Sequence, residues 1–384
     1  MKSVAFFIFG IQNLKGGGGA ERFFSDFYDQ YNNLEEKSFK LYFITDKQSI
    51  NELNSVGKLK NKVNCLKFKI FSNRFKNRLE FLQLLKIIIR HNIKLIHLPL
   101  FNFHYLSLLK KINKLPSFLR PKLIVNISSC YLVPGLQNKV QNEVNTFFPL
   151  FNEIEIDGYF SWYNNFCDYI NNNKQLFKKV PFTYAITSRY SNTNYFFPEK
   201  KENIIVFAAR LDEQKRPDWF IKAIRLILNE NEDLFKDWKF IICGNGVLKS
   251  VLETEAKVLN LEGKIEFKVE GELYKVFNKS KIFVSCQDFE NFPSLAMAEA
   301  MSSGNAIIAR NVGQTNYFLK ENENGMFIKP DSAIGLAQAI FNLVKEEKLI
   351  KNMSDKSVEL MNTVHTFENF VPQIENFWKK IILN

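Results

Sequence analysis

Short, continuously apolar runs alternate along the first half of the chain with longer segments whose apolar residues recur every three or four positions. This alternation predicts strands and helices in turn, because strand side chains repeat every two residues and helical ones every 3.6. Apolar residues at nearly every strand position indicate a parallel sheet covered on both faces. We expect strands at 3–10, 39–45, 63–71, 94–101, 122–129 and 158–163, with helices at 20–31, 76–91 and 103–113.

The alternation stops at residues 186–202, ITSRYSNTNYFFPEKKE, and then begins again. Strands are expected at 203–209, 238–244, 264–269, 281–286, 305–310 and 325–329, and helices at 217–230, 247–259 and 293–302. The pattern predicts two Rossmann-like, doubly wound α/β domains, 1–190 and 191–368. A closing amphipathic helix over 369–384 is expected to pack back on the first domain.

The segment DFENFPSLAMAEAMSSGNAIIAR, residues 288–310, carries Glu290 and Glu299 in a very apolar stretch. Pro293 suits a first helical position and Gly304 the position just past a helix end. Both carboxylates are then expected at the carboxyl edge of the sheet, where ligand hydroxyls would supply the donors they need and the helix N-terminus would bind phosphate. The alternative is a structural glutamate paired with a lysine.

Two other loops that follow strands carry groups suited to phosphate. In VFAARLDEQKRP, residues 206–217, Arg210 offers a planar fork and Lys215 a point charge, which suit a diphosphate, although surface cations are common. In NLKGGGGAERFF, residues 13–24, four glycines allow close backbone approach to a ligand, or make a merely flexible turn. This loop matches neither the dinucleotide fingerprint nor the P-loop. A further glycine turn, CGNGVL, follows at 243–248.

The net charge of +12 is concentrated between residues 58 and 122, where sixteen Lys or Arg accompany one acid, Glu80. Leu, Ile and Phe are interleaved with these cations, a pattern that favours an anionic membrane surface, with Lys110, Lys111 and Lys114 as candidate contacts. Nucleic acid would use the same charge, but no nucleic-acid-binding signature accompanies it, and a solvated basic surface is the simpler alternative.

The five cysteines are scattered and lack CxxC spacing, which argues against both a disulfide framework and a metal cluster and favours a reducing cytoplasm. The start, MKSVAFFIFG, is expected to be a strand rather than a signal peptide. No apolar run reaches the ~18 residues of a membrane span, so association with the inner face of the plasma membrane would be peripheral.

Taken together, KGGGGAER, ARLDEQKRP, GNG and ENFPSLAMAEAMSSGNAIIARNVGQT resemble the retaining glycosyltransferases of family 4, most closely over residues 203–330. The resemblance implies the GT-B fold, with an acceptor-side first domain and a nucleotide-sugar donor domain facing each other across a cleft. It also implies transfer of a hexose-type sugar from a nucleotide-diphosphate-sugar, UDP-sugar favoured over GDP-sugar, to a glycan or lipid-linked glycan. No metal and no further cofactor are implied.

Site residues follow from the resemblance position by position. Arg210 and Lys215 match the pair that holds the donor diphosphate, Glu290 the glutamate by the donor sugar, and Glu299 the one that binds the ribose. Arg210, Lys215 and Glu290 are thus the expected catalytic residues. The expected donor-binding residues are Gly17, Gly18, Gly244, Asn291, Pro293, Ser294, Leu295 and Glu299.

The sequence departs from the family pattern in two places. Eight residues separate the two glutamates where the family has seven. The family's cleft histidine is replaced by Asn126 and Ser128, with His97 and His104 as possible substitutes near another strand end.

Other classes of function stay open at this point. A GT-B epimerase or an inverting transferase would use a similar site, and a non-catalytic GT-B partner protein at a membrane would account for the basic segment and the missing histidine.

Overall fold

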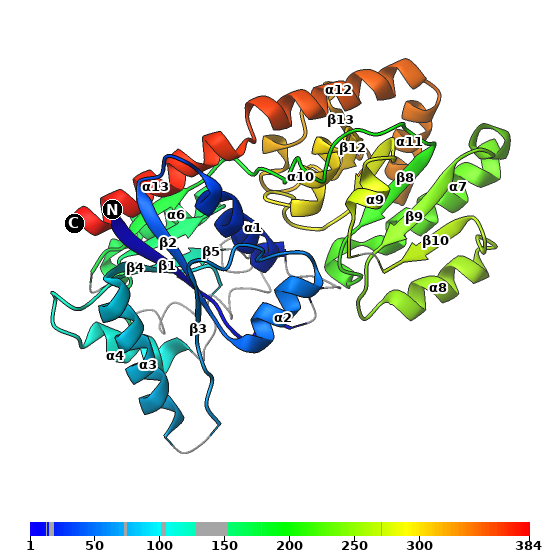
Figure 1. The fold of residues 1–384 in the computed structure, drawn as a ribbon. Helices are drawn as coiled ribbons and strands as arrows, with labels where there is room; N and C mark the ends of the chain where they lie inside the picture. The colour runs from blue at the N-terminus through cyan, green and yellow to red at the C-terminus, as the bar shows by residue number, and fades with distance from the viewer. Residues whose placement is uncertain are drawn as a thin grey trace. The chain divides into compact units, whose positions relative to one another are not determined.

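The computed structural model describes residues 1–12, 14, 19–72, 75–100, 105–127, 153–177, 179–269 and 271–384. The chain forms two compact units, each an α/β structure (Figure 1). Unit 1 comprises Met1–Leu14, Gly18–Thr187 and Val371–Asn384, and unit 2 is built on Ser188–Phe370. None of the helices described has both the length and the apolar character needed to cross a bilayer.

Unit 1 contains a seven-stranded sheet in the order β3-β2-β1-β4-β5-β6-β7, with every neighbouring pair parallel. Its strands are β1 (Lys2–Phe7), β2 (Phe39–Thr45), β3 (Cys65–Lys67), β4 (Ile93–Leu98), β5 (Lys122–Ile127), β6 (Gly158–Ser161) and β7 (Phe182–Ala185). Its helices are α1 (Gly19–Asn33), α2 (Lys47–Ser55), α3 (Lys76–His91), α4 (Leu106–Asn113), α6 (Asn164–Asn172), the short η4 (Lys174–Leu176) and, from Val371 onward, α13 (Phe367–Leu383).

Unit 2 contains a six-stranded parallel sheet in the order β10-β9-β8-β11-β12-β13. Its strands are β8 (Ile204–Ala208), β9 (Lys239–Cys243), β10 (Ile265–Lys268), β11 (Ile282–Ser285), β12 (Ala306–Ala309) and β13 (Gly325–Phe327). Its helices are η5 (Glu213–Lys215), α7 (Pro217–Phe235), α8 (Lys249–Val258), α9 (Tyr274–Phe277), α10 (Leu295–Ser302), η6 (Thr315–Tyr317), α11 (Ala333–Val344) and α12 (Glu347–Thr363).

The chain order reverses between β8 and β11, where two neighbouring strands lead away in opposite directions across the sheet. In open α/β sheets a ligand binds outside the carboxyl ends of the strands at such a reversal. The loops that leave β8 and β11 are therefore the first place to look for a site.

The expected strands are present, shorter by one to several residues at their ends in most cases, and α3 has the bounds expected for the 76–91 helix. The strand β7, whose four residues are only half-buried, was not among the expected elements. Nor were the helices α2, α6, α9, α11 and α12 and the short η4, η5 and η6. The expected start of α10 at Pro293 is wrong. The helix begins at Leu295 because the Ser294 side chain caps it, accepting a hydrogen bond from the Met297 N–H at 3.3 Å.

Helix α13 completes the core of unit 1. The Trp378 side chain is fully buried, with its ring centroid 5.6 Å from that of Phe39 and 6.0 Å from that of Phe6, and its indole N–H donates to His97 Nδ1 at 3.2 Å. The Glu375 carboxylate accepts hydrogen bonds from the Tyr31 hydroxyl and from the backbone N–H of Ser38. Burial and directed hydrogen bonds thus both hold this helix in place.

Replacing Trp378 with Ala should lower the free energy of unfolding by about 3–5 kcal/mol, because it leaves a large cavity and removes the hydrogen bond to His97. Denaturant unfolding followed by circular dichroism measures this. The matched control is Lys379→Ala on the neighbouring exposed position, which should change stability by less than about 0.5 kcal/mol. Equal stability of the two variants would contradict the role given to Trp378.

Candidate active site

The loop that leaves β8 presents the two expected cations of unit 2. Asp212 caps η5, its side chain accepting the Lys215 N–H at 3.2 Å, and it also forms an ion pair with the Arg210 guanidinium. The Arg210 side chain remains 58% exposed. Asp212 thus orients both residues from a single short turn and leaves the Arg210 fork open to an anion.

The glycine turn after β9 packs closely against the backbone of this loop. A Cβ on Gly244 would lie 2.0 Å from the Ala209 carbonyl oxygen, and one on Gly246 would lie 2.3 Å from that of Leu211. The two loops are also joined by backbone hydrogen bonds, including Leu211 N–H to the Asn245 carbonyl at 2.9 Å. Gly244 therefore fits a role in holding the Arg210 loop, whereas its expected contact with the donor stays a prediction.

The exit loops of β8 and β11 are connected directly. Lys215 Nζ donates to the Gln287 side-chain oxygen, and the Asp288 N–H donates to the Gln214 carbonyl at 2.9 Å. Gln287 is buried, and its amide nitrogen donates to the Glu290 carbonyl. The sequence therefore brings Lys215 and the Glu290 loop together at one sheet edge, as the topology predicted.

The Glu290 carboxylate faces the loop after β12. It accepts the N–H of Phe292 at 2.9 Å and the N–H of Gln314 at 2.7 and 2.9 Å, and only 6% of the residue is exposed. A Cβ on Gly313 would lie 2.2 Å from Glu290 Oε2, so the backbone there approaches the carboxylate closely. Burial raises the pKa of Glu290 to about 7 despite these donors. Backbone N–H groups thus satisfy this carboxylate within the protein, and its expected contact with ligand hydroxyls stays a prediction.

Asn291 joins three elements. Its side-chain oxygen accepts from the Ser285 hydroxyl at 2.6 Å, and its nitrogen donates to the Arg310 carbonyl at 3.2 Å and to Thr315 Oγ1 at 3.0 Å. The residue is fully buried. It thus fixes the path of the chain toward Pro293, and its side chain is engaged within the protein.

Helix α10 follows with its first turn at the carboxyl edge of the sheet. Its early N–H groups carry the partial positive charge that suits a phosphate. Pro293, Ser294 and Leu295, at its start, are only partly buried, whereas Glu299, one turn further on, is 8% exposed. The expected donor contacts of these four residues stay predictions.

Arg310, just after β12, was missed as a site residue. Its guanidinium binds Asp331 through two hydrogen bonds of 2.6 Å, pairs with Asp288 in the β11 loop, and lies 4.7 Å from the centroid of the Trp219 ring. The other cation at this ring is Arg216, 5.1 Å from its centroid. The position of Arg310 directly after a strand was the available signal. Its partners indicate that it braces the site loops.

In unit 1, three side chains hold the backbone that leaves β1. The hydroxyl of Tyr105 accepts the Phe9 N–H at 3.0 Å, the Asp46 carboxylate accepts the Gly10 N–H at 2.9 Å, and the Ser49 hydroxyl accepts the Ile11 N–H at 3.0 Å. The expected donor-binding Gly17 and Gly18 come next in the sequence. They lie outside the described residues, as do His104 and Ser128.

His97 does not replace a cleft histidine. It is fully buried in β4 among aromatic rings, and burial lowers its pKa to about 3. Asn126 is also buried, and its amide donates to the Pro99 carbonyl at 3.1 Å, so it joins the ends of β4 and β5. Neither residue is placed to contact a soluble substrate.

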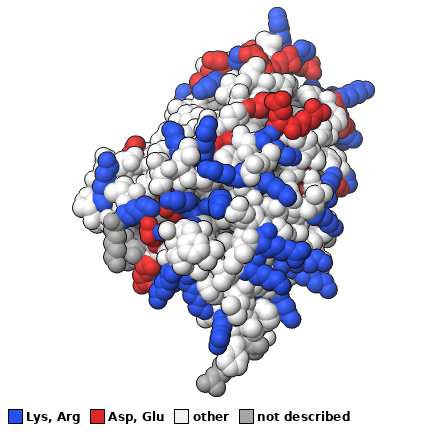
Figure 2. Space-filling model, turned by 60° about the vertical axis from the view of Figure 1, so that its left-hand side comes forward, with Lys and Arg blue, Asp and Glu red and all other residues white. Residues whose placement is uncertain are grey.

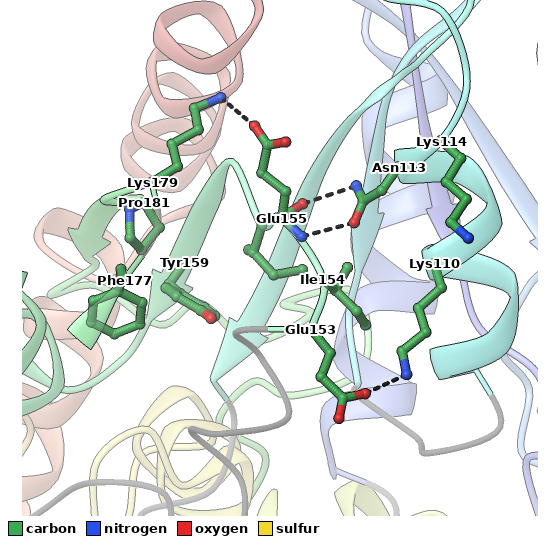
Figure 3. A pocket seen from close by; sticks show the side chains of 11 residues that line it. Lys110, Asn113, Lys114, Glu153, Ile154, Glu155, Tyr159, Phe177, Lys179 and Pro181 are labelled. Carbon is green, nitrogen blue, oxygen red and sulfur yellow. Dashed lines mark hydrogen bonds and ion pairs between the residues drawn. The ribbon is translucent and has the colours of Figure 1, made fainter.

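A pocket of about 530 Å³ lies at the amino ends of β6 and β7 (Figure 3). The loops that leave the strands lie at the opposite edge of the sheet. Four of the pocket's charged groups pair with one another: Lys110 with Glu153, and Lys179 with Glu155 at 3.0 Å. The Asn113 side chain exchanges two hydrogen bonds with the backbone of Glu155. With two of its three lysines paired to glutamates, the pocket does not resemble a diphosphate site.

The site loops of unit 2 lie in a part of the chain that matches a known protein family. The family described as glycosyl transferases group 1 matches residues 193–359, which include the β8 and β11 loops and α10. The resemblance expected over residues 203–330 is confirmed for this part of the chain. The expected fold class, GT-B with two Rossmann-like domains, is likewise confirmed by the two parallel sheets and by full-length structural likeness to glycosyltransferases.

Curated relatives match about half of this chain. A Campylobacter jejuni α-1,4-N-acetyl-D-galactosaminyltransferase, whose name specifies a diphosphate-linked undecaprenol glycan as substrate, is 27% identical over 184 residues, 48% of each chain. An Escherichia coli UDP-Gal:α-D-GlcNAc-diphosphoundecaprenol α-1,3-galactosyltransferase is 27% identical over 191 residues, again 48% of each chain. The matched regions thus span about half the length of these relatives.

Among solved structures, Anabaena HepE in complex with UDP-glucose aligns with a TM-score of 0.74 at 13% identity. The alignment covers 99% of this chain and 100% of HepE. At this identity the likeness establishes the fold.

Replacing Gly244 with Ala should lower the free energy of unfolding by about 1–3 kcal/mol, because the added methyl meets the Ala209 carbonyl and must push the Arg210 loop away. Thermal and denaturant unfolding measure the change. Gly271→Ala is the matched control, since a Cβ there meets no atom within 4 Å. Equal stability of the two variants would show that the glycine turn does not support the loop.

The stability difference between wild type and Glu290→Gln should depend on pH. The folded chain keeps the Glu290 proton up to about pH 7, while the unfolded chain loses it near 4.5. Between these values the folded state binds more protons, so wild type should lose up to about 3 kcal/mol relative to the variant as pH rises through this window. Urea unfolding at pH 4.5, 5.5, 6.5 and 7.5 tests this, and a difference that does not change with pH would contradict it.

Proposed function

We propose that this chain is a retaining, metal-independent glycosyltransferase that moves a hexose-type sugar from a UDP-sugar to a hydroxyl of a glycan or lipid-linked glycan. The observation that carries the proposal is the convergence of Arg210, Lys215 and the N-terminus of α10 at the topological reversal of unit 2. Together they form a cationic edge suited to a diphosphate.

The donor and acceptor classes draw support from relatives. The E. coli relative is named for UDP-Gal, and HepE was solved with UDP-glucose, which favours a UDP-sugar here. Both the C. jejuni and E. coli relatives are named for acceptors linked through a diphosphate to undecaprenol. A lipid-linked acceptor would place the reaction at the inner face of a membrane.

The chemistry needs mainly charge stabilisation. As the bond from the anomeric carbon to the diphosphate breaks, negative charge develops on the leaving phosphate, and Arg210, Lys215 and the helix N–H groups would stabilise it. The acceptor oxygen forms its bond on the same face of the sugar and gives its proton to the leaving phosphate oxygen. This course retains the anomeric configuration without a separate base and without a metal.

The two glutamates would then act differently. Glu299, within α10, would accept hydrogen bonds from the ribose hydroxyls. Glu290 holds the β11 exit loop to the β12 exit loop in this structure, so it would act on the donor by positioning the backbone from Asn291 to Leu295. A direct contact of Glu290 with the sugar stays a prediction.

The proposal predicts that UDP-sugars raise the melting temperature of the chain, since a ligand that binds only the folded state stabilises it, while GDP-, ADP- and CMP-sugars do so less. Arg210→Ala and Lys215→Ala should each weaken this shift and reduce turnover at least tenfold. Lys222→Ala, an exposed cation on α7, is the matched control and should stay within twofold.

Three results would contradict this assignment. Turnover of both variants within about threefold of wild type would exclude Arg210 and Lys215 as diphosphate ligands. Nucleotide-sugar binding with no turnover on any lipid-linked acceptor would favour the non-catalytic alternative, and an inverted product anomer would exclude retention.

A further inference from the structure

Helix α3 presents a distinctive outer side to solvent in unit 1. Its buried residues, Glu80, Leu84 and Ile88, recur every four positions and face the unit. The exposed residues of the helix are Lys76, Asn77, Arg78, Leu82, Lys86, Ile89 and Arg90. The exposed side thus combines four cations with two large aliphatic residues and contains no acid.

The apolar residues form a line along the helix axis. Phe75, at the N-terminal cap, is 62% exposed, Leu82 is 50% exposed and Ile89 is 55% exposed. A spacing of seven residues is close to two helical turns, so the three lie on one side of the helix. Large apolar side chains aligned in this way indicate a contact surface more than scattered single ones do.

The two cations at the start of α3 do not stabilise the helix itself. Lys76 and Arg78 occupy the first turn, where the macrodipole favours acids and disfavours positive charge. The one acid of the helix, Glu80, is turned inward and accepts the Phe71 N–H at 3.0 Å. Within the described part of the chain, no ion pair involves Lys76, Arg78, Lys86 or Arg90.

Other cations of the 58–122 segment are engaged inside unit 1. Lys58 pairs with Asp26, Lys110 with Glu153, Arg120 with Glu155, and Lys122 with Asp157. These acids lie outside the segment in sequence, so a count along the chain overstated its free charge.

Lys111, an expected membrane contact, donates to the Asn77 carbonyl at 2.6 Å. The exposed side of α3 is therefore a better candidate surface than the Lys110–Lys114 patch. Figure 2 shows Lys and Arg spread over much of the visible surface, with residues of other kinds, drawn white, between them.

We propose that the exposed side of α3, made by Phe75, Arg78, Leu82, Lys86, Ile89 and Arg90, docks on an anionic lipid surface. The helix lies in the plane of the headgroups, with its apolar line inserted between them and its cations on either side against lipid phosphates. The inference rests on the proposed function only in that a lipid-linked acceptor resides in such a surface.

The pattern favours lipid over other occupants. Nucleic acid would satisfy the cations but leave the apolar line against a polar backbone. A second copy of the same face would bring cations against cations. A headgroup layer offers both anions and an apolar boundary, which matches both features at once.

Sedimentation of the full chain with vesicles tests the proposal without donor or acceptor. Vesicles with 30% phosphatidylglycerol in phosphatidylcholine should bind, and pure phosphatidylcholine vesicles should bind far less. Lys86→Glu with Arg90→Glu should weaken binding at least about 25-fold, since each cation near such a surface contributes a factor of about five. Lys236→Glu with Lys348→Glu, an equal charge change on exposed positions of unit 2, should stay within twofold.

A second variant tests the apolar line. Leu82→Ser with Ile89→Ser should keep binding at low salt but lose most of it at 0.3 M salt, where electrostatic attraction is screened. Circular dichroism and the UDP-sugar thermal shift verify that both α3 variants fold and bind donor.

Three outcomes would overturn the inference: equal binding to neutral vesicles, unchanged binding of both α3 variants, or self-association of the chain that the α3 variants abolish. A failed thermal shift with intact vesicle binding would instead count against the proposed function alone.

Discussion

The Glu290 carboxylate depends on backbone N–H groups for its burial, and the geometry of the candidate site in unit 2 depends on it in turn. By accepting from Phe292 and Gln314 it ties the loop after β11 to the loop after β12. Asn291 and Arg310 reinforce the same connection. A carboxylate buried without such donors would be costly, so this part of the chain has one favourable arrangement. The start of α10, which offers its N–H groups to a phosphate, is fixed as a result.

Hydrophobic periodicity was enough to predict both sheets and the bounds of α3, because burial on one or both faces leaves a repeat that is local in sequence. The rule that sites follow strand ends correctly brought Lys215 and the Glu290 loop together. The direction of the Glu290 side chain was not predictable, since its partner Gln314 is 24 residues away. The hydrogen bond between His97 and Trp378 was not predictable for the same reason, because the two residues are 281 positions apart.

The charged residues show most clearly how neighbours in the fold differ from neighbours in the sequence. The basic segment 58–122 has one acid of its own, yet Asp26, Glu153, Glu155 and Asp157 reach several of its cations once the strands are side by side. Helix α3 turns its own acid, Glu80, inward, and among the described residues the cations of its exposed side form no ion pair. To predict a contact surface, one therefore needs the exposed charge on one face of a helix or strand rather than the net charge summed along the chain.

The division of the chain has a consequence for its synthesis. Unit 2 is essentially one continuous stretch, Ser188–Phe370, whereas unit 1 needs Val371–Asn384 to complete its core. A ribosome delivers these last residues after all of unit 2. The aromatic cluster around His97 must then wait, with the place of Trp378 unfilled, until all of unit 2 has been translated. Although unit 1 begins first in the sequence, its synthesis is completed after that of unit 2. Until then the apolar surface that Trp378 covers is exposed to chaperones.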